Sequence, residues 1–538
     1  MMHWTVLPVV LPAMMAAIIV LVARHHQMLA RVLSIASTFG LLALALGLFW
    51  QASDGTISIY QLGAWKAPFG IILVADRLAT LMVLLTALLA VPVLLYAVGS
   101  GWDARGRHFH ALFQFQLMGI MGAFLTGDAF NLFVFFEVLL IASYGLMIHG
   151  GGAERLRAGT QYVLYNLLGS TLFLFALGTL YAETGTLNMA DLAGRVAALD
   201  AGDTAGIRVA SVLLLGVFAV KAALLPLHFW LPASYAQAPA PVAALFAIMT
   251  KVGAYGIIRF YTLVFPPDLD LTTGLFGTWL LPAALATLAL GMIGVLGARE
   301  IGRLVAFSVI GSMGMLLAAV AIFTPEGISA ALYYAVHSTF TAAALFLLVD
   351  VIRDRRAAEG RLEQVAPPLR GGALMAGMFF VAAIALCGLP PLSGFVGKLL
   401  VLDAALDSDL IWWIWAVILI SSLVAVVGFG RAGSQIFWKA YQDADPVPPE
   451  EAPEGTMPPP RNSVLPMTSV GILLGYVVVV TVFAGPLTRV TDATVAQLFA
   501  PQPYITKVLE TEGRIIGKAK DAGDPKKKTS DKPDEGGH

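Results

Sequence analysis

Five ionisable side chains stand deep inside apolar stretches of this 538-residue sequence, where they could hold and release protons. They are Glu137, Lys221, Lys251, His337 and Lys398. Lys251 is about eleven residues into the apolar run that begins near Ala240, which is roughly 16 Å along a helix and too far for its side chain to reach water. An ionisable group at such depth is costly, so it normally faces a bundle interior and marks an ion or proton path. A lysine merely tolerated beside a carbonyl or an internal water is the alternative.

Glu137 and Lys221 are expected to form a buried ion pair. Glu137 lies nine residues after Asp128 in GDAFNLFVFFEVLLIASYGL, roughly 13 Å deep at the helical rise. A buried carboxylate needs a cation to remain ionised, and Lys221 is the natural partner. A carboxylate whose influence on a lysine changes can switch that lysine between holding and releasing a proton. The five groups therefore predict a proton path at mid-membrane depth that uses no cofactor and no metal.

Polar residues at helical spacing follow the same segments and could support such a path. These are Tyr162, Asn166 and Ser170 in one segment, Ser308 and Ser312 in another, and Tyr333, His337 and Thr341 in a third. Hydrogen bonding between helices is the commoner use of Ser, Thr and Tyr in membranes and remains open for each stripe. His337 differs because it can titrate near neutral pH.

Composition places the chain among membrane proteins. It is 58% hydrophobic and only 12% charged, with a mean hydropathy of +0.81, whereas about a quarter of the residues of a soluble domain are charged. Its formal net charge of −1, with basic residues scattered over short loops, argues against nucleic acid as a partner. The single cysteine, Cys387, excludes a disulfide framework and a Cys-based metal site. Membrane lipid is the expected surrounding.

About fourteen apolar segments are long enough to cross a bilayer, so we expect an all-α polytopic membrane protein. The first, from Trp4 to Val22, is typical of a membrane helix rather than a secretion signal because its basic cluster follows the apolar run. The segments around Pro226 and Pro390 are broken, each with a lysine nearby. Two broken segments five helices apart predict two inverted five-helix repeats, although a proline kink used only for packing is the alternative.

The predicted organisation has six parts. They are helices 1–3 (1–100), a first repeat of helices 4–8 (101–265), an inverted repeat of helices 9–13 (270–440), a flexible Pro- and Glu-rich cytoplasmic loop (441–463), helix 14 (464–490) and a largely disordered tail (491–538). Arginines fall on alternate loops, which predicts that those loops are cytoplasmic and that both termini lie outside.

Four motifs resemble a known family. TGDAFNLFVFFEVLLIASYGL, KAALLPLHFWLPASYAQAPAPVAALFAIMTKVGAYGIIRF, REIGRLVAFSVIGSMGMLL and GLPPLSGFVGKLLVL are similar to the proton-translocating antiporter-like subunits shared by Mrp-type (Mnh, Pha) cation/proton antiporters and respiratory complex I. The resemblance covers roughly residues 76–439, and within the family it is to the D-type subunits.

The resemblance implies a fourteen-helix subunit of a bacterial cytoplasmic-membrane complex, with A-, B-, C-, E-, F- and G-type partner subunits, that exchanges protons for Na⁺ or K⁺ in pH homeostasis. By matching position it implies Glu137 and Lys221 as an ion pair, Lys251 as central proton carrier, His337 as relay and Lys398 as terminal group. His228 matches the histidine beside the seventh-helix break. Thr341 departs from the family, since many relatives carry a lysine there.

Three readings stay open at this point. The first is a secondary transporter subunit, which is not an enzyme. The second is an M-like proton-pumping subunit of complex I or of a membrane-bound hydrogenase, which would make the chain part of a translocase. Lys398 favours the first, because the M-like subunit usually carries a glutamate there. The third is a scaffold whose buried charges only hold partner subunits.

Overall fold

Nearly all of the chain is visible in the computed structural model. The structure describes residues 3–199, 205–266, 269, 274–356, 358, 360–366, 369, 371–439 and 464–513. The predicted flexible loop 441–463 lies outside these residues, and so does the tail from residue 514 onward.

The first half of the chain is a bundle of long apolar helices. Its helices are α1 (Leu7–Leu21), α2 (Gln27–Ala52), α3 (Arg77–Ser100), α4 (Phe109–Leu125), α5 (Ala129–Met147), α6 (Ala153–Thr184), α8 (Ala205–Lys221), α9 (Trp230–Gln237) and α10 (Ala240–Leu263). Aspartates begin two of them, because Asp76 accepts the backbone N–H of Ala79 in α3 and Asp128 accepts that of Asn131 in α5.

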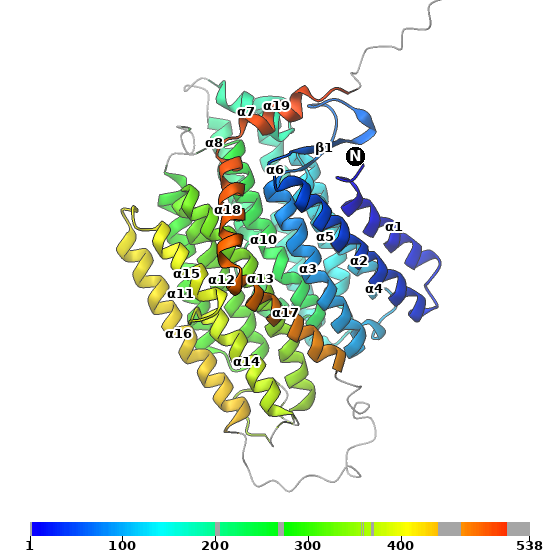
Figure 1. Cartoon of the computed structure of the whole chain (residues 1–538), viewed down its shortest axis with the longest axis vertical. Helices are drawn as coiled ribbons and strands as arrows, with labels where there is room; N and C mark the ends of the chain where they lie inside the picture. The colour runs from blue at the N-terminus through cyan, green and yellow to red at the C-terminus, as the bar shows by residue number, and fades with distance from the viewer. Residues whose placement is uncertain are drawn as a thin grey trace, which may run out of the picture.

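The second half is built in the same way and packs against the first. Its helices are α11 (Leu281–Gly297), which continues a π-helical turn at Phe276–Leu280, α12 (Ile301–Ile322), α13 (Pro325–Arg355), α14 (Gly372–Cys387), α15 (Ser393–Ala404), α16 (Ile411–Phe437) and α17 (Val464–Val482). The long helix α13 lies at the centre, where it contacts α3, α10, α12, α14, α15 and α17 (Figure 1). In the described residues, ten helices are long and apolar enough to cross a membrane, and α1, α4 and α14 are shorter apolar helices.

Two predicted interruptions are present. Between Lys221, the last residue of α8, and Trp230, the first of α9, the chain leaves the helix, and the N–H of Leu225 is satisfied by the side chain of Thr287 on α11 at 2.8 Å. The second interruption separates α14 from α15. Gly388 ends α14 with a φ of +73°, a conformation that a side chain would strain.

One end of the bundle carries small elements that the sequence patterns did not predict. Strands β1 (Ser58–Gln61) and β2 (Ile72–Ala75) form an antiparallel hairpin. The amphipathic helix α7 (Met189–Ala197) packs against α19 (Gln502–Glu510) at the same end (Figure 1). The prediction that 491–538 is largely without structure is therefore wrong for its first part, since α18 (Ala484–Leu498) and α19 are helices that bury two apolar residues each.

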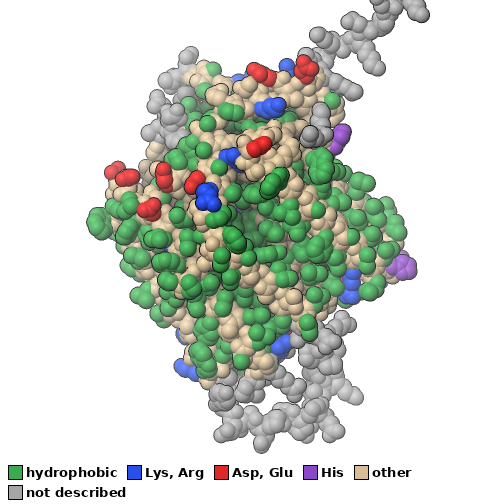
Figure 2. Space-filling view, in the orientation of Figure 1, with side chains coloured by type: hydrophobic (Ala, Val, Ile, Leu, Met, Phe, Trp, Pro, Cys, Tyr) green, Lys and Arg blue, Asp and Glu red, His purple; other side chains and the backbone are tan. Residues whose placement is uncertain are grey.

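The surface matches a lipid environment. Figure 2 shows hydrophobic side chains over most of the visible face, with Asp and Glu side chains gathered in its upper part. Large apolar side chains such as Leu21, Phe175 and Trp412 are 82%, 65% and 78% exposed. Water would make this exposure unfavourable, whereas hydrocarbon chains would not.

The basic loops lie at one end of the bundle, as charge alternation predicts. Arg31 on α2 binds Asp103 in the α3–α4 connection, and the imidazole of His149, after α5, contacts the carbonyl of Trp102 in that connection. Arg299, between α11 and α12, pairs with Glu363, between α13 and α14.

Candidate functional site

The five predicted ionisable residues lie on helices that contact one another in series. Glu137 is on α5 and Lys221 ends α8, with α6 packed against both. From α8 the contacts continue to α10, α13, α15 and α16. Lys221, Lys251, His337 and Lys398 are all at most 7% exposed. The bundle thus holds one titratable group on each of five helices along a continuous row of neighbours.

The expected direct pair of Glu137 and Lys221 is not formed. No nitrogen–oxygen contact within 4.0 Å joins them, although Glu137 acts on Lys221 electrostatically. Lys221 instead donates to the amide oxygen of Asn166 on α6 at 3.2 Å and lies 5.8 Å from the ring centre of Phe136. One carboxylate oxygen of Glu137 is buried and has no hydrogen-bond partner among the described residues. Glu137 therefore keeps an acceptor free, and Asn166 holds the lysine.

A small cavity of about 20 Å³ lies beside Lys221. Phe136, Leu139, Leu140, Tyr162, Asn166, Lys221, Trp230, Met249 and Val252 line it. That volume suffices for about one water molecule. Of the polar lining residues, Asn166 and Tyr162 already bond Lys221 and Ser143, so Lys221 is the residue with a position left for a water. Tyr162 in turn contacts Ser143 on α5 at 2.9 Å. Two lining residues, Met249 and Val252, flank Lys251 in sequence, so the cavity extends from α8 to α10.

Lys251 is the central group and it is unpartnered. Its side chain is buried, the residue is 1% exposed, and its Nζ has no hydrogen-bond partner within the described part of the chain. Close packing fixes its helix: a Cβ added at Gly253 would come within 2.7 Å of the backbone nitrogen of Ala222. Lys251 is thus held at the level of the α8 interruption with three donor hydrogens unused.

His337 connects α10 to the second interruption. Its Nδ1 lies 2.8 Å from the hydroxyl of Ser393, the first residue of α15. The charges of Lys251 and Lys398 both act on its imidazole. A Cβ added at Gly394 would clash with the carbonyl oxygen of Ala385 and would lie 2.9 Å from Nε2 of His337, so a glycine is required where α15 passes α14 and the ring. The imidazole can therefore exchange a proton on the Ser393 side.

Lys398 is fixed by the broken helix itself. Its Nζ donates to the carbonyl of Cys387 at 2.6 Å and to the hydroxyl of Ser422 on α16 at 2.8 Å. Cys387 is the last residue of α14, where helix carbonyls lack their usual partners and favour a cation. The interruption after Cys387 hence supplies a binding position for the ammonium group.

Some of the predicted supporting residues point elsewhere. The hydroxyl of Tyr333 donates to the carbonyl of Val480 on α17, and those of Ser308 and Thr341 donate to carbonyls of their own helices. His228 has a partly exposed ring whose centre lies 4.4 Å from that of Phe229, with the two rings tilted by 31°. Pro226 and Pro390 are exposed and lie in the two interruptions. Ser312 interacts with Tyr334, which lies beside His337.

Sequence reasoning missed several residues around this row. Ser393 contacts His337 and Ser422 contacts Lys398, but neither serine recurs at helical spacing with other polar residues in a way that could have marked it. A buried ion pair joins Arg259 on α10 to Asp76, with Nη1–Oδ2 at 2.6 Å and Nη2–Oδ1 at 2.8 Å. The arginine's place in an apolar run was a signal that could have found this pair.

Asp128, an acidic residue at one end of the bundle, has a shifted pKa. Burial raises the pKa of Asp128, in the α4–α5 connection, to about 6, although backbone N–H groups of Asn131 and Phe130 act in the opposite direction. Within the described residues, no group of three or more His, Cys, Asp or Glu side chains is placed to hold a metal ion.

Comparison with known proteins gives consistent matches. Residues 126–424 match the family described as NADH:quinone oxidoreductase/Mrp antiporter, transmembrane. The chain is 39% identical to the D-type subunit of a probable K(+)/H(+) antiporter of Rhizobium meliloti (strain 1021), over 94% of this chain and 97% of that protein. It is 37% identical to the D-type subunit of the Na(+)/H(+) antiporter of Bacillus subtilis (strain 168), over 95% of this chain and 100% of the relative.

A solved structure has the same fold. A chain in the structure of the Mrp complex from Dietzia sp. DQ12-45-1b superposes with a TM-score of 0.83 at 29% identity, covering 95% of this chain and 100% of that chain.

Proposed function

The chain belongs to the NADH:quinone oxidoreductase/Mrp antiporter family as a D-type member of the Mrp-type cation/proton antiporters, and from this premise we propose that it carries the protons of the exchange along Glu137, Lys221, Lys251, His337 and Lys398. It is a multi-pass membrane protein of the bacterial cell membrane and part of an Mrp complex with other subunits. It is a transporter subunit.

The single observation that supports this path is the state of Lys251. Its Nζ is buried and has no hydrogen-bond partner in the described residues, and it lies on the helix that links the half of the bundle holding Lys221 to the half holding His337. A lysine kept only for structure would be expected to have its donors satisfied, because an unpaired buried charge is costly. A lysine that repeatedly takes up and gives away a proton needs free positions for its carriers.

The proton transfers follow from the neighbours of each group. Glu137 influences Lys221 electrostatically, and the water-sized cavity gives Lys221 a route toward α10. His337 accepts a proton at one ring nitrogen and passes a proton toward Ser393. Lys398, bound to the carbonyl at the end of α14, is the next titratable group. Since the side chain of Thr341 bonds its own helix, Ser393 is the residue through which His337 contacts α15.

We also propose how the helices are arranged in the membrane. Fourteen spans, with the two interruptions five spans apart, would form inverted repeats over 101–265 and 270–440, between helices 1–3 (1–100) and helix 14 (464–490). The arginine-bearing end would face the cytoplasm and both termini the outside. Partner subunits of A, B, C, E, F and G type would complete the complex, which would expel Na⁺ or K⁺ for pH homeostasis.

Everted membrane vesicles that contain the whole complex provide the test. The collapse of a pH gradient on addition of Na⁺ or of K⁺ measures exchange and identifies the cation. Glu137→Ala, Lys221→Ala and Lys251→Ala should each abolish the collapse while the complex still assembles. Lys507→Ala, an exposed lysine on α19, is the matched control and should behave as wild type. Full exchange by the three variants would leave only the scaffold role for these charges.

A further inference from the structure

A cleft of about 400 Å³ opens between the α1–α2 connection and the α3–α4 connection, away from the row of buried lysines. Its polar lining includes Arg24, His25, Gln27, Arg105, Arg107 and His108. The only acidic residue in the lining is Asp103. Three arginines around one recess give it the character of an anion site.

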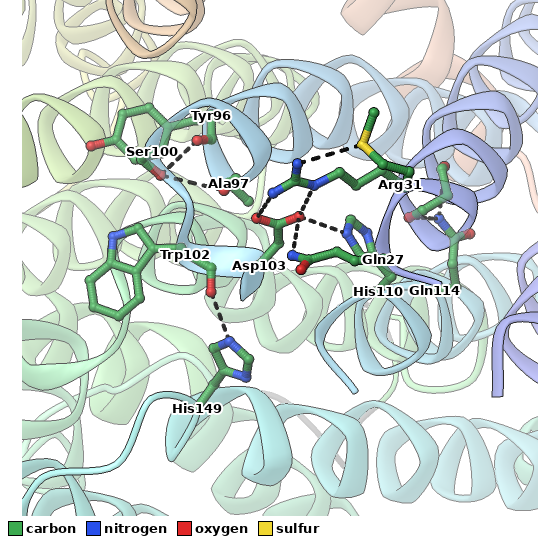
Figure 3. Close-up of polar contacts among 12 residues, drawn as sticks. Gln27, Arg31, Tyr96, Ala97, Ser100, Trp102, Asp103, His110, Gln114 and His149 are labelled. Atoms are coloured by element: carbon green, nitrogen blue, oxygen red, sulfur yellow. Dashed lines mark hydrogen bonds and ion pairs between the residues drawn. The ribbon is translucent and has the colours of Figure 1, made fainter. Parts of the chain in front are cut away.

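Asp103 does not neutralise these arginines, because other groups already hold it. Arg31 donates to both of its carboxylate oxygens, at 2.6 and 2.9 Å, and His110 lies 3.0 Å away (Figure 3). Burial alone would raise the pKa of Asp103, but the hydrogen bonds from His110 and Arg31 hold it below its usual range. The carboxylate is therefore ionised and paired, and Arg31 and His110 hold it in place in the lining of the cleft.

Two of the three arginines at the rim remain available. Arg24 and Arg107 are exposed and form no ion pair with any described residue. Arg105 lies over the ring of Trp102, with its guanidinium carbon 3.7 Å from the ring centre. A guanidinium group can donate two parallel hydrogen bonds to phosphate oxygens. Two unpaired guanidinium groups beside one cleft therefore match a phosphate group.

Exposed apolar side chains lie at the ends of α1 and α2 that border the cleft. Leu21 and Val22 are 82% and 62% exposed at the end of α1, and Met28 and Val32 are 69% and 60% exposed at the start of α2. A free phosphate ion gains nothing from such a surface. A phosphate that carries acyl chains gains burial along it.

We propose that this cleft binds the headgroup of an anionic phospholipid, with the phosphate between Arg24 and Arg107 and the acyl chains over α1 and α2. A basic recess at the end of membrane helices, next to exposed apolar surface, is the arrangement that recognises such headgroups. The lipid would tie the α1–α2 connection to the α3–α4 connection from outside, while Arg31 and Asp103 tie them from inside.

Native mass spectrometry of the purified whole complex tests this site, with cardiolipin, phosphatidylglycerol, phosphatidylcholine and inorganic phosphate as separate probes. The double variant Arg24→Gln/Arg107→Gln should bind the two anionic lipids about thirtyfold more weakly, the factor given by two basic side chains at about 1 kcal/mol each. The Arg31 and Asp103 pair is untouched, so the fold should persist. The control Arg299→Gln/Arg303→Gln removes one arginine from the α11–α12 connection and one from the first turn of α12, and it should bind as wild type.

Several results would overturn the proposal. Equal loss of lipid in both double variants would mean that charge alone attracts it. Binding of inorganic phosphate that competes with the lipids at equal affinity would make the site one for free anions. Equal retention of phosphatidylcholine would remove the requirement for negative charge, and a neighbouring subunit filling the cleft in the assembled complex would exclude lipid.

Discussion

The Nδ1 atom of His337 lies 2.8 Å from the hydroxyl oxygen of Ser393, so a side chain of α13 meets the first residue after the α14–α15 interruption. Lys398 stands five residues further along α15 and binds the carbonyl of Cys387, the last residue before that interruption. A hydroxyl can accept a proton and donate one at the same time. In the proposed proton path, Ser393 would therefore act as the relay next to His337, since Thr341 supplies no lysine there.

Replacing Ser393 by alanine should slow cation-driven collapse of the pH gradient by about tenfold, the effect of losing a hydrogen bond worth about 1.4 kcal/mol in the transfer step. Ser393→Thr retains the hydroxyl and should restore most of the rate. Equal rates for alanine, threonine and wild type in everted vesicles would show that protons do not use this hydroxyl.

Two opposite changes at Val252 test the water-sized cavity beside Lys221. Val252→Leu adds a methylene group to a space of about 20 Å³ and should displace the water, which would lower the exchange rate by roughly tenfold. Val252→Ala enlarges the space and should keep the rate while lowering the free energy of unfolding by about 1–3 kcal/mol. A leucine variant that exchanges as fast as the alanine variant would argue against a hydrated link at this place.

Asp128 should make the stability of the protein depend on pH with an unusual sign. Its pKa of about 6 in the folded protein is above the value of about 3.9 of an unfolded chain. The folded state thus binds the proton more tightly, and the stability from that preference is full below pH ~4 and lost as the pH rises through about 6. Asp128→Asn keeps an oxygen to cap α5 and should raise the free energy of unfolding by on the order of 2 kcal/mol at pH 8.

The measurement for Asp128 is the thermal midpoint of the purified complex at pH 5 and at pH 8. The gain from Asp128→Asn should be clearly larger at pH 8. Asp76, the other aspartate cap, serves as the contrast, because Asp76→Asn removes the carboxylate partner of buried Arg259 and should cost about 3–5 kcal/mol at both pH values. An equal gain from Asp128→Asn at the two pH values would contradict the raised pKa.

The row of charged residues could be predicted from the sequence because depth in an apolar run depends only on length. Lys251 is buried for that reason, and the interruptions near Pro226 and Pro390 follow from proline and glycine chemistry. The contacts of each charge depend on how far each helix is rotated, which sequence spacing does not determine. Lys221 accordingly meets Asn166 rather than Glu137.

Contacts between residues far apart in the chain could not be predicted from the sequence for the same reason. Asp76 and Arg259 are 183 residues apart, and no spacing rule connects them. The helices α18 and α19 were missed because they are short and only moderately apolar, so their stability comes from packing, for example through Tyr504, rather than from their own composition.

The exchange rate of Lys251→Arg in everted vesicles that contain the whole complex tests the central claim most directly. Arginine keeps a positive charge and a long side chain at this buried position, but it does not release its proton in proteins. A proton path through Lys251 predicts that the complex assembles and that the pH gradient no longer collapses on addition of Na⁺ or K⁺. Exchange at the wild-type rate would contradict it, because a fixed charge would then suffice.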